Sequence, residues 1–220
     1  MKSTAITFLV CATLAGPSAA QVGLANRNMN GELIVAARAN SVATVQALLD
    51  QGASANSRNR LGDTPLNTAA RAGNLELVRL LIDRGADVNL ANLARVTPLM
   101  SAAYGGHAEI VKLLIASRAD IGALDRLQKH AMVYAAGNGN AAAVRELLDA
   151  GVGVNQRFVN ETTALMWAAA YGNIDIVKLL LERGADPQAR DDRGKTALAI
   201  ADENRQGEAE RMLRAVGGRP

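Results

Sequence analysis

The sequence of 220 residues contains little cysteine, histidine or aromatic residue. Its single cysteine, Cys11, lies near the N-terminus, so we expect no disulfide, thiolate metal site or cysteine nucleophile in the rest of the chain. The two histidines, His107 and His130, have no second histidine or cysteine nearby, which argues against a metal site. The sequence also lacks a glycine-rich phosphate loop and a carboxylate pair. We therefore expect no catalytic residue, no bound metal and no cofactor.

Charge of one sign is not concentrated in any segment. The 24 basic and 21 acidic side chains are mixed along the chain and give a formal net charge of +3. Nucleic-acid binding would require a basic face, so we expect no nucleic-acid partner. Because 49% of the residues are hydrophobic and only 3% are aromatic, the core must consist of Ala, Leu, Val and Ile. This composition favours short, closely stacked helices.

The first 20 residues differ from the remainder of the chain. Lys2 precedes an apolar stretch over residues 5–15, and the small residues Ser18 and Ala20 follow it. This is the layout of a secretory signal peptide, and the apolar stretch is shorter than the about 18 residues that span a bilayer. We predict cleavage after Ala20 and a periplasmic or secreted protein that does not insert into a membrane.

A repeat of 33 residues organises the rest of the sequence. Apolar residues recur at this spacing in several columns: Leu33, Leu66, Leu99, Met132, Leu165 and Leu198; Ala36, Ala69, Ala102, Ala135, Ala168 and Ala201; Leu48, Leu81, Leu114, Leu147, Leu180 and Leu213. The columns divide a repeat domain over residues 21–220 into six units, at about 26–58, 59–91, 92–124, 125–157, 158–190 and 191–220.

The local signals within a unit predict two short helices and a turn. Thr64 is a preferred helix N-cap, and Pro65 suits the first helical position because its missing N–H is not needed there. Gly73 ends this helix. Residues 77–81 supply the apolar stripe of a second helix, and Gly85 offers the left-handed conformation that closes it.

These residues resemble the ankyrin repeat. The resemblance is carried by Thr64-Pro65-Leu66, Thr97-Pro98-Leu99, Gly106-His107-Ala108-Glu109-Ile110-Val111-Lys112-Leu113-Leu114 and Arg183-Gly184-Ala185-Asp186. It implies an all-α ankyrin-repeat solenoid of about six helix-turn-helix units with β-turn fingers. It also implies a monomer that binds a protein on its concave side, formed by the fingers and the first helix of each unit. The first and last units depart from the pattern, as the caps of a solenoid do. The Ala- and Arg-rich composition suggests a bacterium of high genomic GC content, and together with the signal segment it suggests an exported bacterial member of the family.

The two histidines occupy different positions in their units. His107 stands where ankyrin repeats commonly have a histidine, at the start of the second helix, and we expect it to make structural hydrogen bonds. His130 replaces the threonine that caps the first helix as Thr64 and Thr97. It is either a structural substitution or an exposed, pH-sensitive contact.

The aromatic residues that follow the signal segment are all in units three to five: Tyr104, Tyr134, Phe158, Trp167 and Tyr171. Tyr134 and Trp167 share one column of the first helix, and either pack between repeats or contact a partner. We expect Tyr104, Tyr171 and Phe158 to be exposed. Neighbouring rings of this kind are typical of binding hot spots.

The fingers of the same three units lack a turn glycine. Gly62 and Gly194 are replaced there by Arg95, Gln128 and Glu161, which indicates a different finger conformation or side chains used for contact. Apolar residues are expected at the exposed finger tips. They are Leu61, Leu93, Val96, Leu127 and Val159.

We therefore predict a protein–protein interaction module that binds a partner on the concave face of units three to five. An inhibitor or immunity-type protein, which occludes the active site of an exported enzyme, is the alternative. The sequence leaves both open, because a concave scaffold suits either role.

Overall fold

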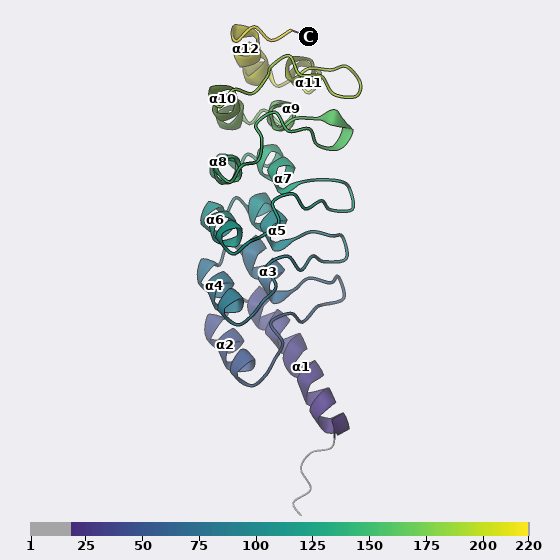
Figure 1. Cartoon of the computed structure of the whole chain (residues 1–220), viewed down its shortest axis with the longest axis vertical. Helices are drawn as coiled ribbons and strands as arrows, with labels where there is room; N and C mark the ends of the chain where they lie inside the picture. Colours follow the sequence, from purple (N-terminus) through teal and green to yellow (C-terminus); the bar gives the residue numbers. More distant parts are fainter. Residues whose placement is uncertain (1–18, 220) are drawn as a thin grey trace, which may run out of the picture.

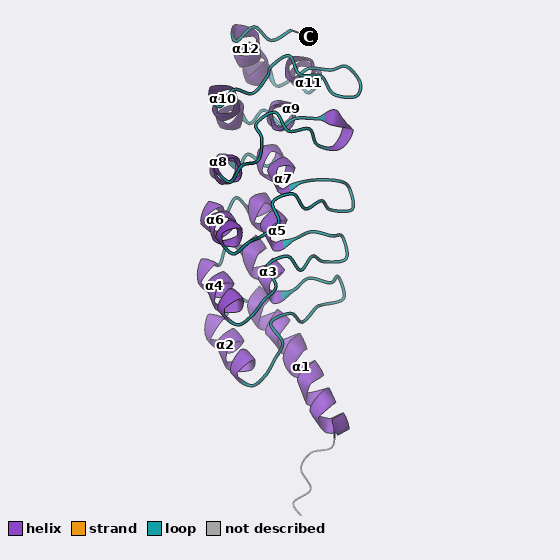
Figure 2. Cartoon of the chain, viewed as in Figure 1, coloured by secondary structure: helices purple, strands orange, loops and turns teal. Residues whose placement is uncertain are grey.

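The computed structural model describes residues 19–219, which form twelve α-helices, one 3₁₀ segment and no strand (Figure 2). Residues 1–18 of the predicted signal segment lie outside the described residues. Helix α1 is described from Ala19, so the predicted cleavage position after Ala20 falls in its first turn. Export and cleavage stay predictions.

The helices form pairs that stack along one axis (Figure 1). The first helices of the six units are α1 (Ala19–Arg38), α3 (Pro65–Ala72), α5 (Pro98–Gly105), α7 (Ala131–Gly137), α9 (Ala164–Ala170) and α11 (Ala197–Glu203). The second helices are α2 (Val42–Asp50), α4 (Leu75–Asp83), α6 (Ala108–Ala116), α8 (Ala141–Asp149), α10 (Ile174–Glu182) and α12 (Gly207–Ala215). The predicted all-α solenoid of six helix-turn-helix units is confirmed.

A finger loop precedes each first helix from α3 onward, and these loops project on the side opposite the second helices (Figure 1). We name them by unit: finger two (59–63), finger three (92–96), finger four (125–129), finger five (158–162) and finger six (191–195). Finger five contains the 3₁₀ segment η1 (Val159–Glu161). The row of second helices, the row of first helices and the row of fingers thus form three parallel layers.

Threonine and glycine define the ends of the first helices as predicted. The Thr64 and Thr97 side chains accept a hydrogen bond from the N–H three residues later, and each is followed by proline. Gly73 and Gly106 end their helices in the left-handed conformation, with φ of 80° and 77°. His130 also caps its helix, because its Nδ1 accepts a hydrogen bond from the Met132 N–H at 3.0 Å.

The recurring apolar columns form the core. Each member of the column that begins with Leu33 is no more than 1% exposed, and the alanine column that begins with Ala36 is buried in every unit. Alanine at this position lets the backbones of neighbouring first helices approach closely. The 33-residue period of the sequence is therefore the period at which buried residues recur in one continuous hydrophobic core.

A polar residue before each of three second helices links its unit to the preceding one. Asn140 and Asn173 each donate from Nδ2 to two carbonyl oxygens at the C-terminal end of the first helix of the preceding unit, at 2.7 to 3.1 Å. His107 Nε2 lies 3.1 Å from the carbonyl oxygen of Arg71. These bonds satisfy helix-end carbonyls that would otherwise lack a donor. The expected structural role of His107 is confirmed, and its bond runs between repeats.

Four of the fingers open with Asn or Asp, whose side-chain oxygen accepts two main-chain N–H groups of the same turn. These residues are Asn59, Asn92, Asp125 and Asp191. Three positions later the backbone is left-handed at Gly62 and Gly194, and equally at Arg95 and Gln128, with φ of 63° and 58°. Losing the glycine therefore leaves the conformation of fingers three and four unchanged.

Finger five differs because Phe158 stands where the other fingers have Asn or Asp. Without a side-chain acceptor the turn rearranges, and Asn160 and Glu161 are both left-handed, with φ of 57°. The Phe158 side chain is only 7% exposed, and its ring centroid lies 5.2 Å from that of His130. The prediction that Phe158 is exposed is wrong, since the altered finger packs the ring inward.

The fingers are cross-linked by main-chain hydrogen bonds, with one gap. Finger three donates to finger two, finger four to finger three and finger six to finger five, each through one N–H···O bond of 3.0 or 3.1 Å. Within the described chain no main-chain bond joins fingers four and five. A crevice of about 440 Å³ separates them, lined in part by His130 and Phe158. The rearranged turn of finger five thus interrupts the ladder.

Candidate functional site

The first helices and the fingers form one continuous surface, which we call the inner face. Three hollows lie along it. The first hollow, of about 240 Å³, is lined by residues of units two to four, and the central hollow, of about 140 Å³, by residues of units three to five. The third hollow, of about 160 Å³, joins units five and six. Tyr104 and Tyr134 line the first two hollows, and Trp167 lines the second and third. The three hollows therefore form one row.

Four aromatic side chains surround the central hollow, and we call them the aromatic cluster: Tyr104, Tyr134, Trp167 and Tyr171. The Tyr104 and Tyr134 rings meet edge to face, with centroids 6.0 Å apart. The Trp167 and Tyr171 rings are stacked, with centroids 6.3 Å apart and planes 12° from parallel. The structure brings together four of the five aromatic residues singled out in the sequence and leaves Phe158 apart from them.

The members of the aromatic cluster differ in exposure. Tyr104 is 53% and Tyr171 59% exposed, as predicted. Tyr134 and Trp167 are partly buried against the hydrophobic core, yet both line the central hollow. Both rings therefore pack between repeats and also reach the surface, and their contact with a partner stays a prediction.

Hydrogen bonds fix the two partly buried rings. The Tyr134 hydroxyl donates to Asp125 Oδ2 at 2.5 Å, and Trp167 Nε1 donates to Thr162 Oγ1 at 2.8 Å. Burial, together with the hydrogen bond and charge of Asp125, raises the pKa of Tyr134, so the phenol stays protonated. The rings form a preorganised floor, which reduces the entropy lost on binding.

Lys129, at the end of finger four, completes the central hollow and was missed in the sequence. Its Nζ lies 5.8 Å from the ring centroid of Tyr134 and 5.6 Å from that of Trp167, at the distances of cation–π contacts. Lys195 stands at the same repeat position in finger six. The 33-residue period alone could have placed Lys129 beside the first helices, had polar as well as apolar columns been compared.

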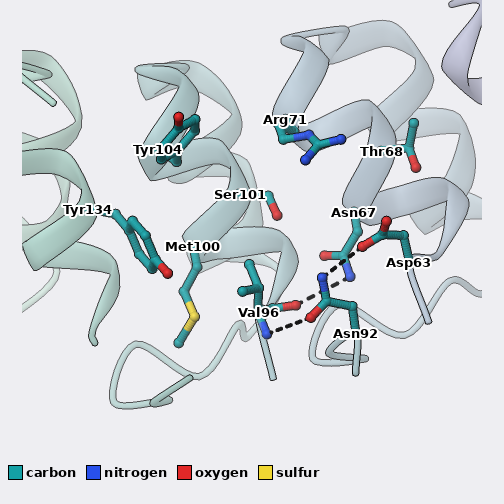
Figure 3. A pocket seen from close by; sticks show the side chains of 10 residues that line it. All are labelled: Asp63, Asn67, Thr68, Arg71, Asn92, Val96, Met100, Ser101, Tyr104 and Tyr134. Atoms are coloured by element: carbon teal, nitrogen blue, oxygen red, sulfur yellow. Dashed lines mark hydrogen bonds between the residues drawn. The ribbon is translucent and has the colours of Figure 1, made fainter. Parts of the chain in front are cut away.

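The first hollow has polar walls (Figure 3). Asn92 Nδ2 donates to Asp63 Oδ1 at 2.7 Å, and Asn67 Nδ2 donates to the carbonyl oxygens of Leu90 and Val96. Asn67 is 3% exposed, and its Oδ1 has no hydrogen-bond donor among the described residues. This hollow therefore offers polar groups where the central hollow offers rings.

The three finger leucines singled out in the sequence are exposed, at 66% for Leu61, 54% for Leu93 and 67% for Leu127. They lie on fingers two to four and do not line the three hollows. Their exposure is confirmed, and their contact with a partner stays a prediction.

His130 is not the exposed imidazole that a pH-sensitive contact requires, because it is only 2% exposed. Burial lowers the pKa of His130 and so favours the neutral ring. Of the two alternatives for His130, the structural substitution is confirmed and the exposed contact is wrong, since the ring caps α7 and is enclosed at the crevice between fingers four and five.

Two chemical features are absent from the part of the chain that the structure describes. Residues 19–219 hold no cluster of three His, Cys, Asp or Glu side chains arranged to bind a metal. None of the helices in that range is long and apolar enough to cross a membrane.

Comparison with known families agrees with the architecture. The family model described as ankyrin repeats (3 copies) matches residues 33–125, 99–191 and 132–217. The chain belongs to the ankyrin-repeat family. No curated protein matches it. Ankyrin repeats generally serve as protein–protein interaction modules and not as enzymes, and this ankyrin-repeat chain is accordingly an interaction module for a protein partner.

Proposed function

We propose that this ankyrin-repeat protein is exported, loses residues 1–20 and holds a protein partner on the inner face of units three to five. The aromatic cluster carries the proposal. Two half-exposed tyrosines stand beside two rings that are fixed by hydrogen bonds, around a hollow that needs no rearrangement to receive a side chain. Aromatic residues in such settings contribute most of the binding energy at protein interfaces.

Capture of the partner tests this function. The full-length chain with a C-terminal affinity tag is expressed in its source organism, and proteins retained from periplasmic and cytosolic fractions are identified by mass spectrometry. We expect one protein to be retained by the wild type. We expect the double variant Tyr104→Ala/Tyr171→Ala to bind it at least about tenfold more weakly, since each hot-spot ring contributes about 2 kcal/mol.

A matched control is Val35→Ala, which truncates a side chain that is 66% exposed in the first unit, away from the aromatic cluster. It should bind the partner as the wild type does. Equal retention by the double variant would reject the inner face as the binding surface. N-terminal sequencing of the recovered protein tests cleavage after Ala20, and retention from the cytosolic fraction alone would reject export.

The same complex decides between a scaffold and an inhibitor. A tight equimolar complex in which an enzyme loses its activity would favour the inhibitor or immunity-type alternative. A partner that stays active, or becomes more stable, would favour a scaffold.

A further inference from the structure

The inner face contains cations whose charge is not balanced by the chain. Arg71 lines the first hollow and Lys129 the central hollow, and neither forms an ion pair among the described residues. Arg71 projects from α3 on one side of the first hollow, with Tyr104 and Tyr134 on the other (Figure 3). A bound segment that followed the row of hollows would pass both cations.

Two acids beside the first and central hollows, Asp63 and Asp125, already accept hydrogen bonds. Asp63 accepts hydrogen bonds from Asn59 and Asn92. Asp125 is 2% exposed and accepts hydrogen bonds from the Tyr134 hydroxyl and from two N–H groups of its own turn. The carboxylates thus stabilise the fingers and neighbouring rings, while the cations remain available to an external group.

Unit six shows the pairing that unit four lacks. Lys195, at the position of Lys129, forms an ion pair with Glu203 Oε1 at 2.5 Å. The residue that corresponds to Glu203 in unit four is Gly137. Glycine leaves room for the Tyr171 ring, which lies 3.6 Å from the position that a Cβ would take, but it supplies no carboxylate. The central hollow therefore contains Lys129, the counterpart of Lys195, but no carboxylate at the position of Glu203.

The fingers beside the first two hollows add to this imbalance. Fingers two to four, with the residue that precedes finger two, present exposed arginines and no exposed carboxylate. The arginines are Arg58, Arg60, Arg95 and Arg126. The second helices, by contrast, have exposed side chains of both signs, with acids in excess. The exposed charge on fingers two to four is therefore positive, whereas that on the second helices is negative.

We propose that the inner face binds an acidic segment of the partner protein, with one carboxylate on Lys129 in the central hollow and another on Arg71 in the first hollow. This inference rests on the proposed function and specifies the chemistry of the partner. Apolar or aromatic side chains between the two carboxylates contact Tyr104 and Tyr134. A continuous polyanion such as a nucleic acid fits less well, because Arg71 and Lys129 are the only cations that line the first and central hollows.

Trp167 gives a direct readout, because it is the only tryptophan of the chain and Lys129 lies over its ring. The emission of the full-length protein is titrated with three blocked peptides of about eight residues, long enough to cover about 26 Å when extended. One alternates Glu with Ala, one replaces Glu by Gln and one replaces Glu by Lys. We expect saturable binding of the glutamate peptide, weakened by added salt, and no binding of the other two.

Charge variants locate the site. We expect Lys129→Gln to weaken binding of the glutamate peptide about tenfold, Arg71→Gln to weaken it by a smaller factor, and Lys129→Arg to retain it. Lys112→Gln removes the same charge from an exposed position on α6 and should change the affinity less than about twofold. Circular dichroism and thermal unfolding check that each variant folds.

Several outcomes would overturn the inference: equal binding of the glutamine peptide, tighter binding of the lysine peptide, tighter binding of an oligothymidylate, or equal losses in the Lys129 and Lys112 variants. The proposed function fails differently. It would still hold if a captured partner were lost by the double tyrosine variant yet bound independently of Lys129. It would be rejected if the glutamate peptide bound but no protein were ever retained.

Discussion

His130 shows how a single substitution in a repeat column changes its surroundings. Where other units place a threonine hydroxyl, this unit places an imidazole whose Nδ1 performs the same capping function. The larger ring lies against Phe158 at the crevice between fingers four and five. Protonation of Nδ1 would remove the acceptor and place a charge in a buried site, so the neutral ring is part of the folded state.

The lowered pKa of His130 predicts a pH dependence of stability. The unfolded chain binds this proton near pH 6.5, whereas the folded chain binds it only at lower pH. The stabilisation is therefore complete above about pH 6.5 and is lost as the pH falls through the interval below it, by up to about 1.4 kcal/mol per pH unit. Urea unfolding between about pH 5 and 8 measures this fall.

His130→Thr introduces the residue that caps α3, α5, α9 and α11. It should remove the fall in the free energy of unfolding below about pH 6.5, even if it changes stability at neutral pH. His107→Asn introduces the residue found in the same column at Asn140 and should leave the fall in place. Parallel profiles for the wild type and the His130 variant would show that this histidine does not cause the dependence.

Residue by residue, the sequence predicted burial well where a column repeats and poorly where a unit departs from it. The leucine and alanine columns are buried in every unit because each copy faces the same neighbours. Phe158 was mispredicted because its exposure depends on a missing acceptor: a finger without Asn or Asp at its first position adopts another turn. Lys129 was missed because its importance arises from rings in two different units.

At the scale of the elements, the fingers depend on a second set of asparagines that precede them. Asn56, Asn89 and Asn155 each donate from Nδ2 to a carbonyl oxygen of the following unit and accept an N–H two residues beyond it, at 2.8 to 3.2 Å. The same column contains Gly122 ahead of finger four. Units three and four therefore lack this bridge.

Gly122→Asn should restore the bridge and stabilise the protein by about 1 kcal/mol. A Cβ at this position would meet only Asp120 Oδ1, at an ordinary contact distance of 3.4 Å, so the side chain can be accommodated. Urea unfolding measures the gain. Gly122→Ala is the control, because it reduces the conformational freedom of the unfolded chain as Gly122→Asn does but cannot form the hydrogen bonds of the bridge. Equal stabilities of the two variants would show that no bridge forms.

The elements themselves could be predicted, because threonine, proline and glycine define the helix ends chemically. The conformation of the fingers could not. Replacing glycine by Arg95 and Gln128 indicated either a different turn or side chains used for contact, and the turn does not change, because the side-chain acceptors of Asn92 and Asp125 hold these backbones left-handed. The conformation of the turn depends on the acceptor three residues before the left-handed position, so the residue at that position does not predict it alone.

At the scale of the whole molecule, the first and last units of the ankyrin stack each pack against one other unit within residues 19–219. The main helix–helix contacts run within a unit or between adjacent units, so stability is approximately a sum over units and their interfaces. The end units are then the first to open, and hydrogen exchange should show the highest amide protection in α5 to α8 and the lowest in α1, α2, α11 and α12.

Two core substitutions test this additivity. Leu213 in α12 and Leu99 in α5 are both at most 1% exposed. Leu99→Ala should lower the free energy of unfolding by about 2–5 kcal/mol and reduce protection throughout the central units. Leu213→Ala should reduce protection in α11 and α12 alone. Loss of protection along the entire chain in the Leu213 variant would indicate a single cooperative unit instead.

The missing main-chain hydrogen bond between fingers four and five also has a mechanical consequence. Where fingers four and five lack a main-chain bond, the second-helix side keeps the Asn173 bonds and the Arg183–Asp149 ion pair. Because this finger-to-finger bond is missing, we expect the stack to bend more easily between units four and five than between its other units. Tyr134 belongs to unit four and Trp167 to unit five, so bending there would change the spacing between two rings that are each fixed within their own unit.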